Sequence, residues 1–89
     1  ITIFPSPYRI PSIRPMVIDG VPQGSSVQII SLNGIDIKTL DQNQINEYQA
    51  AWNGMNGKGV YVESGVYLVL IINKKHNTST IKKIAVIKN

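Results

Sequence analysis

The stretch from Trp52 to Tyr67 constrains the fold of this chain more than any other part of the sequence. It begins with the only tryptophan and leads directly into the most apolar run, residues 66–72. The loop residues that permit a positive φ are Gly54, Gly57 and Gly59. Gly65 is expected to allow a close backbone approach just before the apolar run. Since Trp52 alone can bury about 150–250 Å², the stretch predicts an aromatic anchor, a turning loop and a core strand in succession.

The length and composition indicate one globular domain spanning residues 1–89. Hydrophobic residues make up 43% of the chain, which is typical of a folded protein. The absence of cysteine excludes disulfides and thiolate metal sites. The apolar run 66–72 is too short for a membrane helix, which needs about 20 residues. Because Ile1 is not an initiator methionine and no leader follows it, we expect this to be a fragment of a longer protein.

Short apolar segments separated by turn residues favour an all-β fold. We expect about seven strands, over residues 1–4, 16–21, 27–32, 35–40, 45–52, 66–72 and 78–87. Asn33-Gly34 predicts a hairpin turn, and residues 41–44 predict a polar loop. The composition of 45–52 would tolerate a helix, but its period of two favours a strand. The broken period around Lys82 and Lys83 suggests a β-bulge. The pattern indicates an antiparallel β-sandwich of immunoglobulin-like (Ig-like) type.

The proline-rich segment 5–15 has two interpretations. Its four prolines exclude a helix and remove ladder donors, so the segment must be extended. It could pack Tyr8 and Ile10 along the body of the domain, or it could be only a spacer.

No constellation in the sequence predicts catalysis, a cofactor or a metal. His76 is the only histidine, and it lies in an expected turn. The five acids are dispersed: Asp19, Asp36, Asp41, Glu47 and Glu63. Asn53, Asn56 and Glu63 could offer oxygens to calcium, but two of them are neutral amides. The glycine loop lacks the Lys-Ser/Thr and the helix of a phosphate-binding loop.

The lysines in the last part of the sequence have two possible interpretations. They are Lys74, Lys75, Lys82, Lys83 and Lys88. They could protect an edge strand from aggregation, or they could form an anion-binding face. Nucleic acid is not an expected partner, because its binding needs exposed aromatics among the basic residues, whereas the aromatic residues Trp52 and Tyr67 look like core.

The central stretch also resembles a family signature, W-[DN]-G-x-[DN]-x-x-G-x-x-V-x-S-G-x-Y. The residues that fit it are Trp52, Gly54, Asn56, Gly59, Val62, Ser64, Gly65 and Tyr67. The pattern is similar to that of the Ig-like C-terminal domains of proteins exported by the type IX secretion system of Bacteroidetes. It is shared with the related Ig-like domain of the flagellar hook-capping protein. Segments 4–7, 27–37 and 82–88 resemble further family motifs, with Ser6 and Ser31 replacing Asn and Asp.

The resemblance implies that the domain is a sorting signal. The type IX translocon would recognise it, and a sortase-like enzyme could then remove it and attach the cargo to anionic lipopolysaccharide. The parent protein would be exported through the periplasm to the outer-membrane surface or beyond. We expect the recognition strand to contain Lys82, Lys83, Ile84, Val86 and Lys88, read by β-augmentation. The alternative is an accessory Ig-like interaction module with no sorting role, and an enzyme is not expected.

Overall fold

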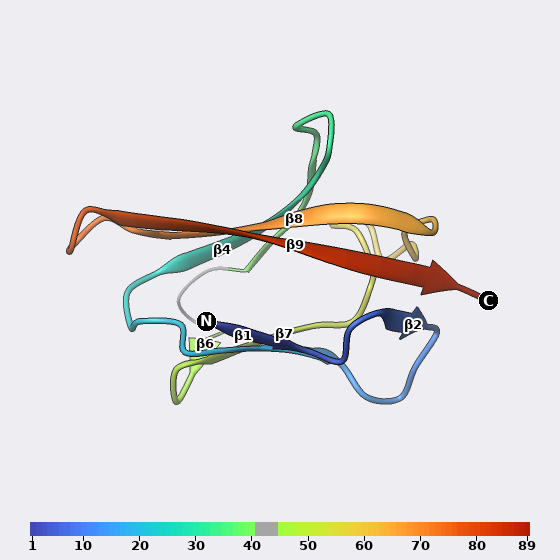
Figure 1. Cartoon of the computed structure of the whole chain (residues 1–89), viewed down its shortest axis with the longest axis horizontal. Helices are drawn as coiled ribbons and strands as arrows, with labels where there is room; N and C mark the ends of the chain where they lie inside the picture. The colour runs from blue at the N-terminus through green and yellow to red at the C-terminus, as the bar shows by residue number, and fades with distance from the viewer. Residues whose placement is uncertain (41–44) are drawn as a thin grey trace.

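The computed structural model describes residues 1–40 and 45–89, and these form two β-sheets packed face to face (Figure 1). The four-stranded sheet has the order β1 (Thr2–Phe4), β3 (Met16–Asp19), β7 (Gln49–Trp52), β6 (Ile45–Asn46). The five-stranded sheet has the order β2 (Tyr8–Ile10), β9 (Thr78–Lys88), β8 (Gly65–Asn73), β4 (Ser26–Ser31), β5 (Asp36–Leu40). The Ig-like β-sandwich is therefore confirmed, with nine strands in the described residues rather than about seven.

One of the additional strands comes from the expected strand 45–52, which is a tight hairpin of β6 and β7. The two turn residues, Glu47 and Tyr48, have φ values of 51° and 66°, as a two-residue hairpin of this hand requires. The carbonyl oxygen of Tyr48 accepts hydrogen bonds from the backbone N–H groups of Gly20 (2.9 Å) and Val21 (2.8 Å). Gly20 and Val21 are distant from the turn in sequence, and their hydrogen bonds help to stabilise it although neither turn residue is a glycine. The expected polar loop 41–44 lies outside the described residues.

The other additional strand, β2, lies within the proline-rich segment. It pairs in parallel with the end of β9, with Tyr8 opposite Val86 and Ile10 opposite Lys88. Tyr8 and Ile10 are 1% and 0% exposed, so this part of the segment belongs to the body and is not a spacer. Because proline lacks an N–H donor, a strand bounded by prolines is suited to the edge of a sheet, and β2 is an edge strand.

The prediction of a β-bulge at Lys82 and Lys83 is wrong. The register of β8 and β9 runs without a shift from Gly65↔Val86 to Asn73↔Thr78. The period looks broken in the sequence because Ile81 is an exposed apolar residue on the outer face. The register shifts instead between β4 and β5, at Ile29/Ile30.

The Asn33-Gly34 turn joins β4 to β5 as expected, but through a three-residue loop. The Gly34 N–H donates to the Ser31 carbonyl oxygen at 2.9 Å, and the Ser31 N–H donates to the Ile35 carbonyl oxygen at 2.9 Å. Of these residues, only Gly34 has a positive φ, 83°. Such a type I turn followed by a left-handed glycine is the usual three-residue hairpin.

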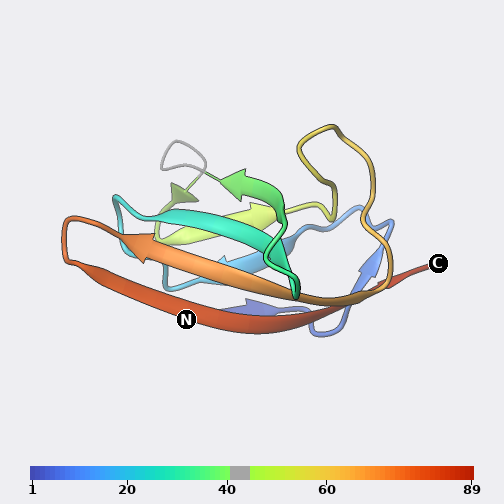
Figure 2. The ribbon, with the colours of Figure 1, turned by 90° about the horizontal axis from the view of Figure 1, so that it is seen from above.

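The core lies between the two sheets, which are seen from above in Figure 2. Its buried hydrophobic residues are Tyr8, Ile10, Met16, Ile18, Val21, Val27, Ile29, Leu40, Ala50, Trp52, Val62, Val69, Ile71, Ile84 and Val86. The apolar run 66–72 lies within β8, in the middle of its sheet. Only one face of β8 is buried, with Val69 and Ile71 inside and Val66 exposed, so the run is a strand of a sandwich core and is not covered on both faces.

Candidate functional site at the closing strand

The expected recognition strand is β9, which has 11 residues and is the longest strand described. One of its edges pairs with β8 along nearly its whole length. The other edge pairs with β2 only at residues 86–88. Among the described residues, the stretch 78–85 therefore has an open edge, and in Figure 1 β9 crosses the front of the molecule.

The five expected recognition residues do not share one environment. Lys82 and Lys83 are exposed and point to opposite faces, because successive side chains of a strand alternate. Ile84 and Val86 are only 5% and 2% exposed and belong to the core. A receptor could reach the backbone of Ile84, whereas the edge at Val86 is already paired with β2, and neither side chain is accessible without opening the sandwich. Exposed lysines on an open edge fit both edge protection and receptor contact.

Trp52, the first residue of the family motif, contacts aromatic residues from two other strands. It is buried, and its indole N–H donates to the Met55 carbonyl oxygen at 2.8 Å. Its ring lies 6.3 Å from that of Tyr8 and 6.3 Å from that of Tyr67, centroid to centroid. These distances are typical of favourable tilted aromatic pairs. Trp52 thus joins β2, β7 and β8.

Gly54 has the close backbone approach that was expected at Gly65. Its φ is 82°, and a Cβ there would lie 2.7 Å from Cγ2 of the buried Ile10. A Cβ on Gly65 would meet nothing nearer than Cε2 of Tyr67, at 3.9 Å. The expectation for Gly65 is wrong, because β8 begins at the exposed end of the sheet.

Asn56 and Gly59 shape the turn of the central loop. The Asn56 Oδ1 accepts hydrogen bonds from the backbone N–H groups of Lys58 (2.9 Å) and Val60 (3.1 Å), and Gly59 has a φ of 80°. The Asn53 Oδ1 accepts one from the Met55 N–H at 3.1 Å. Both amide oxygens considered as calcium ligands therefore face backbone donors. The described residues contain no cluster of three or more His, Cys, Asp or Glu that could hold a metal.

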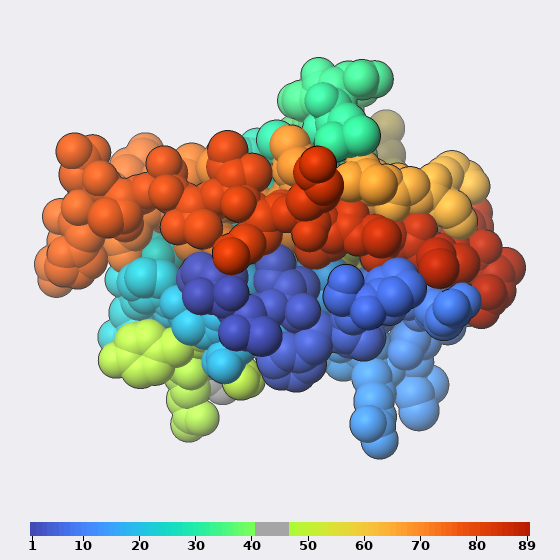
Figure 3. Space-filling view, in the orientation of Figure 1, coloured from blue at the N-terminus to red at the C-terminus, as the bar shows by residue number. Residues whose placement is uncertain are grey.

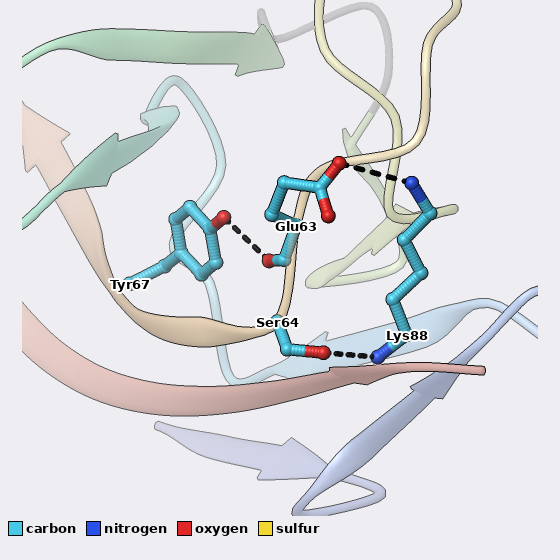
Figure 4. A network of polar contacts seen from close by, with 4 residues as sticks. All are labelled: Glu63, Ser64, Tyr67 and Lys88. Carbon is cyan, nitrogen blue, oxygen red and sulfur yellow. Dashed lines mark hydrogen bonds and ion pairs between the residues drawn. The ribbon is translucent and has the colours of Figure 1, made fainter.

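Ser64 and its neighbours fasten the end of β9 to the start of β8 (Figure 4). The Ser64 Oγ accepts a hydrogen bond from the Lys88 backbone N–H at 2.7 Å. The Lys88 Nζ pairs with the Glu63 carboxylate at 3.1 Å, and this pair is largely exposed, so it contributes little to stability. The Tyr67 Oη donates to the Glu63 carbonyl oxygen at 2.7 Å. Burial, and secondarily the nearby Glu63 carboxylate, raises the pKa of Tyr67 above its usual 10.0.

Two buried polar residues were not singled out from the sequence. Asn73 directly follows the expected strand 66–72 but is the last residue of β8, and its Nδ2 donates to the Gln23 carbonyl oxygen and to Ser25 Oγ, both at 3.0 Å. Its Oδ1 accepts the backbone N–H of His76 at 3.0 Å. An amide directly after a seven-residue apolar run was the available signal.

Tyr8 was expected to pack, but not to make a polar contact. Its Oη donates to the Arg14 carbonyl oxygen at 3.1 Å. Burial is the main reason that the pKa of Tyr8 is raised above 10.0. The hydrogen bond ties β2 to the loop that follows it.

The sandwich is similar to part of a solved structure of a secretion-system component. No protein-family model matches the sequence, and no curated protein matches it. One solved structure is similar, with a TM-score of 0.81 and 27% sequence identity over 97% of this chain. It is PorZ, described as an essential bacterial surface component of the type-IX secretion system of Porphyromonas gingivalis.

The similarity confirms the resemblance to type IX secretion-related Ig-like domains that the motif indicated. The chain spans only 11% of the length of PorZ. What PorZ does as a whole is therefore a property of a much larger protein. Among the residues that the structure describes, no helix has the length and apolarity needed to cross a membrane.

Proposed function

We propose that this chain is a non-catalytic Ig-like domain that the type IX secretion machinery recognises as a sorting signal. It would direct its parent protein through the periplasm to the outer-membrane surface or the extracellular space. The observation that carries the proposal is the similarity of 97% of the chain to part of PorZ, a surface component of that system. The match of the central motif, Trp52 to Tyr67, supports it independently.

Recognition would use the open edge of β9. A receptor strand can add to the backbone of residues 78–85, where β2 leaves the edge free. Lys82 and Lys83 would steer the domain towards an acidic receptor surface. Ile84 and Val86 would hold the strand to the core, so that its edge is presented in a fixed register. A translocon protein is the proposed partner, while a sortase-like enzyme and anionic lipopolysaccharide follow from the family resemblance alone.

The test is to fuse residues 1–89 to an exported reporter in a host with a working type IX system. Lys82→Glu with Lys83→Glu should abolish surface delivery and leave the reporter in the periplasm. The matched control, Lys74→Glu with Lys75→Glu, makes the same charge change in the exposed turn between β8 and β9 and should be delivered normally. Both variants should remain folded, because exposed charge changes usually alter stability by within about 0.5 kcal/mol.

Two outcomes would contradict parts of the proposal. Normal delivery of the folded Lys82→Glu/Lys83→Glu variant would remove these lysines from the signal. Normal delivery after deletion of residues 80–89 would remove the sorting function itself.

The lysines on the open edge of β9 are also compatible with a second candidate function, because they could serve only to protect that edge from aggregation. In that case the domain is an accessory interaction module of a surface protein. The wild-type fusion would then stay in the periplasm, while the Lys82→Glu/Lys83→Glu variant would differ from wild type only in solubility.

A further inference from the structure

The loop between β2 and β3, residues 11–15, projects from the sandwich on the side of the four-stranded sheet. It is the blue segment that extends below the body in Figure 1, and in Figure 3 it forms a separate protrusion. Ile13 is fully exposed at this loop, with a relative accessibility of 101%. A single exposed isoleucine is ordinary by itself, so the surroundings of the loop decide whether it has a function.

Two hydrogen bonds and two prolines restrain the loop. The Tyr8 Oη donates to the Arg14 carbonyl oxygen at 3.1 Å, and the Ser12 Oγ accepts a hydrogen bond from the Arg14 N–H at 3.1 Å. Pro11 and Pro15 fix φ at both ends of the loop. Ile13 is therefore presented by a preorganised segment, which lowers the entropy lost on binding.

A groove of about 550 Å³ lies beside the loop. Its lining residues are Phe4, Pro5, Ser12, Arg14, Pro15 and Val17. Phe4 is 45% exposed and lies opposite Val17 in the pairing of β1 with β3. The groove is therefore mostly apolar, with one cation at its wall, and its volume is in the range of about 300–1,000 Å³ that is usual for ligand sites.

The charge around the groove decides between possible occupants. The Arg14 side chain is exposed and lines the groove. Arg14 forms no ion pair within the described residues, where the one ion pair is Lys88–Glu63. A second copy of this chain has a net charge of +4 and would repel its partner, whereas an acidic segment would be attracted.

We propose that the groove and the 11–15 loop form a docking surface for an extended acidic segment of a partner protein. An apolar side chain of that segment fills the groove between Phe4 and Pro15. A flanking carboxylate pairs with the Arg14 guanidinium, and the next apolar side chain packs on Ile13. The surface belongs to the four-stranded sheet, whereas the open edge of β9 belongs to the five-stranded one. The proposal therefore does not depend on the sorting function.

The test is an NMR titration of ¹⁵N-labelled residues 1–89 with the capped peptide Glu-Phe-Glu-Leu-Glu, and with Lys-Phe-Lys-Leu-Lys as the charge-reversed control. The acidic peptide should shift the amides of Phe4, Ile13 and Val17 saturably, and it should bind about tenfold more tightly than the basic one. Arg14→Glu and Ile13→Ser should each weaken binding about fivefold to tenfold, as loss of a contact at the centre of an interface does. The control Lys58→Glu, in the distant central loop, should change it less than about twofold.

Several outcomes would overturn the proposal, provided that the variants keep the wild-type spectrum elsewhere. These are the absence of saturable shifts at millimolar acidic peptide, equal binding of the two peptides, and shifts confined to the edge of β9. Concentration-dependent shifts of the same amides in the free domain would instead assign the surface to a second copy. Broadening of these amides by phosphatidylglycerol vesicles, lost in Ile13→Ser, would assign it to a membrane surface.

Discussion

Gly54→Ala tests whether the glycine loop packs its backbone directly on β2. Two separate effects act at this position. A residue with a Cβ is strained at a φ of 82°, which costs about 1–2 kcal/mol. The new Cβ would also lie 2.7 Å from Ile10 Cγ2 and 3.5 Å from Tyr8 Cε2. Because Ile10 is fully buried and β-branched side chains are stiff, overpacking should add about 1–3 kcal/mol.

The chain provides a control that separates the two effects. Gly34 has nearly the same φ, 83°, but a Cβ added there would meet nothing within 4 Å. Gly34→Ala should therefore show the strain alone, about 1–2 kcal/mol, against roughly 2–5 kcal/mol for Gly54→Ala. Urea unfolding followed by the fluorescence of Trp52, the only tryptophan, would measure both. Each kcal/mol should also lower Tm by about 4–8 °C in a domain of this size.

A second substitution tests whether the clash is with Ile10. Ile10→Leu moves the branch away from Cβ and so removes the Cγ2 atom that the added Cβ of the Gly54→Ala variant would meet. The double variant should be more stable than the sum of the two single effects by about 1 kcal/mol or more. Equal destabilisation by Gly54→Ala and Gly34→Ala, or full additivity with Ile10→Leu, would refute the assignment of a tight contact.

Two further predictions concern the closing strand and the two tyrosines, Tyr8 and Tyr67, whose pKa values are raised. Ser64→Ala should increase hydrogen exchange at the Lys88 amide and lower the free energy of unfolding by about 0.5–1.5 kcal/mol, because that amide loses its 2.7 Å acceptor; unchanged exchange would show that Ser64 does not fasten β9. The raised pKa values of Tyr8 and Tyr67 mean that the folded state favours the neutral phenols. Their contribution to stability is fully present below about pH 10 and is lost as the pH rises through the raised values. Urea midpoints measured between about pH 8 and 11 should fall only at the alkaline end, and Tyr67→Phe should reduce this fall.

Only part of the candidate site could be predicted from the sequence. Lys82 and Lys83 could be identified as exposed because lysines are rarely buried. That Ile84 and Val86 point into the core follows from the pairing of β9 with β8. The open edge at 78–85 depends on where β2 stops, and β2 contacts β9 across more than 70 intervening residues. No local pattern encodes that distance.

The sequence by itself determined the class of fold and most strand positions, because alternation of apolar residues and turn residues such as Asn33-Gly34 act over a few neighbours. It also identified Trp52 as the anchor, since a tryptophan can bury about 150–250 Å² of surface in a core. Only the tertiary structure decided that the proline-rich segment contains a parallel strand, that Gly54 rather than Gly65 meets a neighbour, and that one edge of β9 is open. Each of these depends on which distant segments pack together, because burial and edge pairing are settled by the whole sandwich rather than by local propensity.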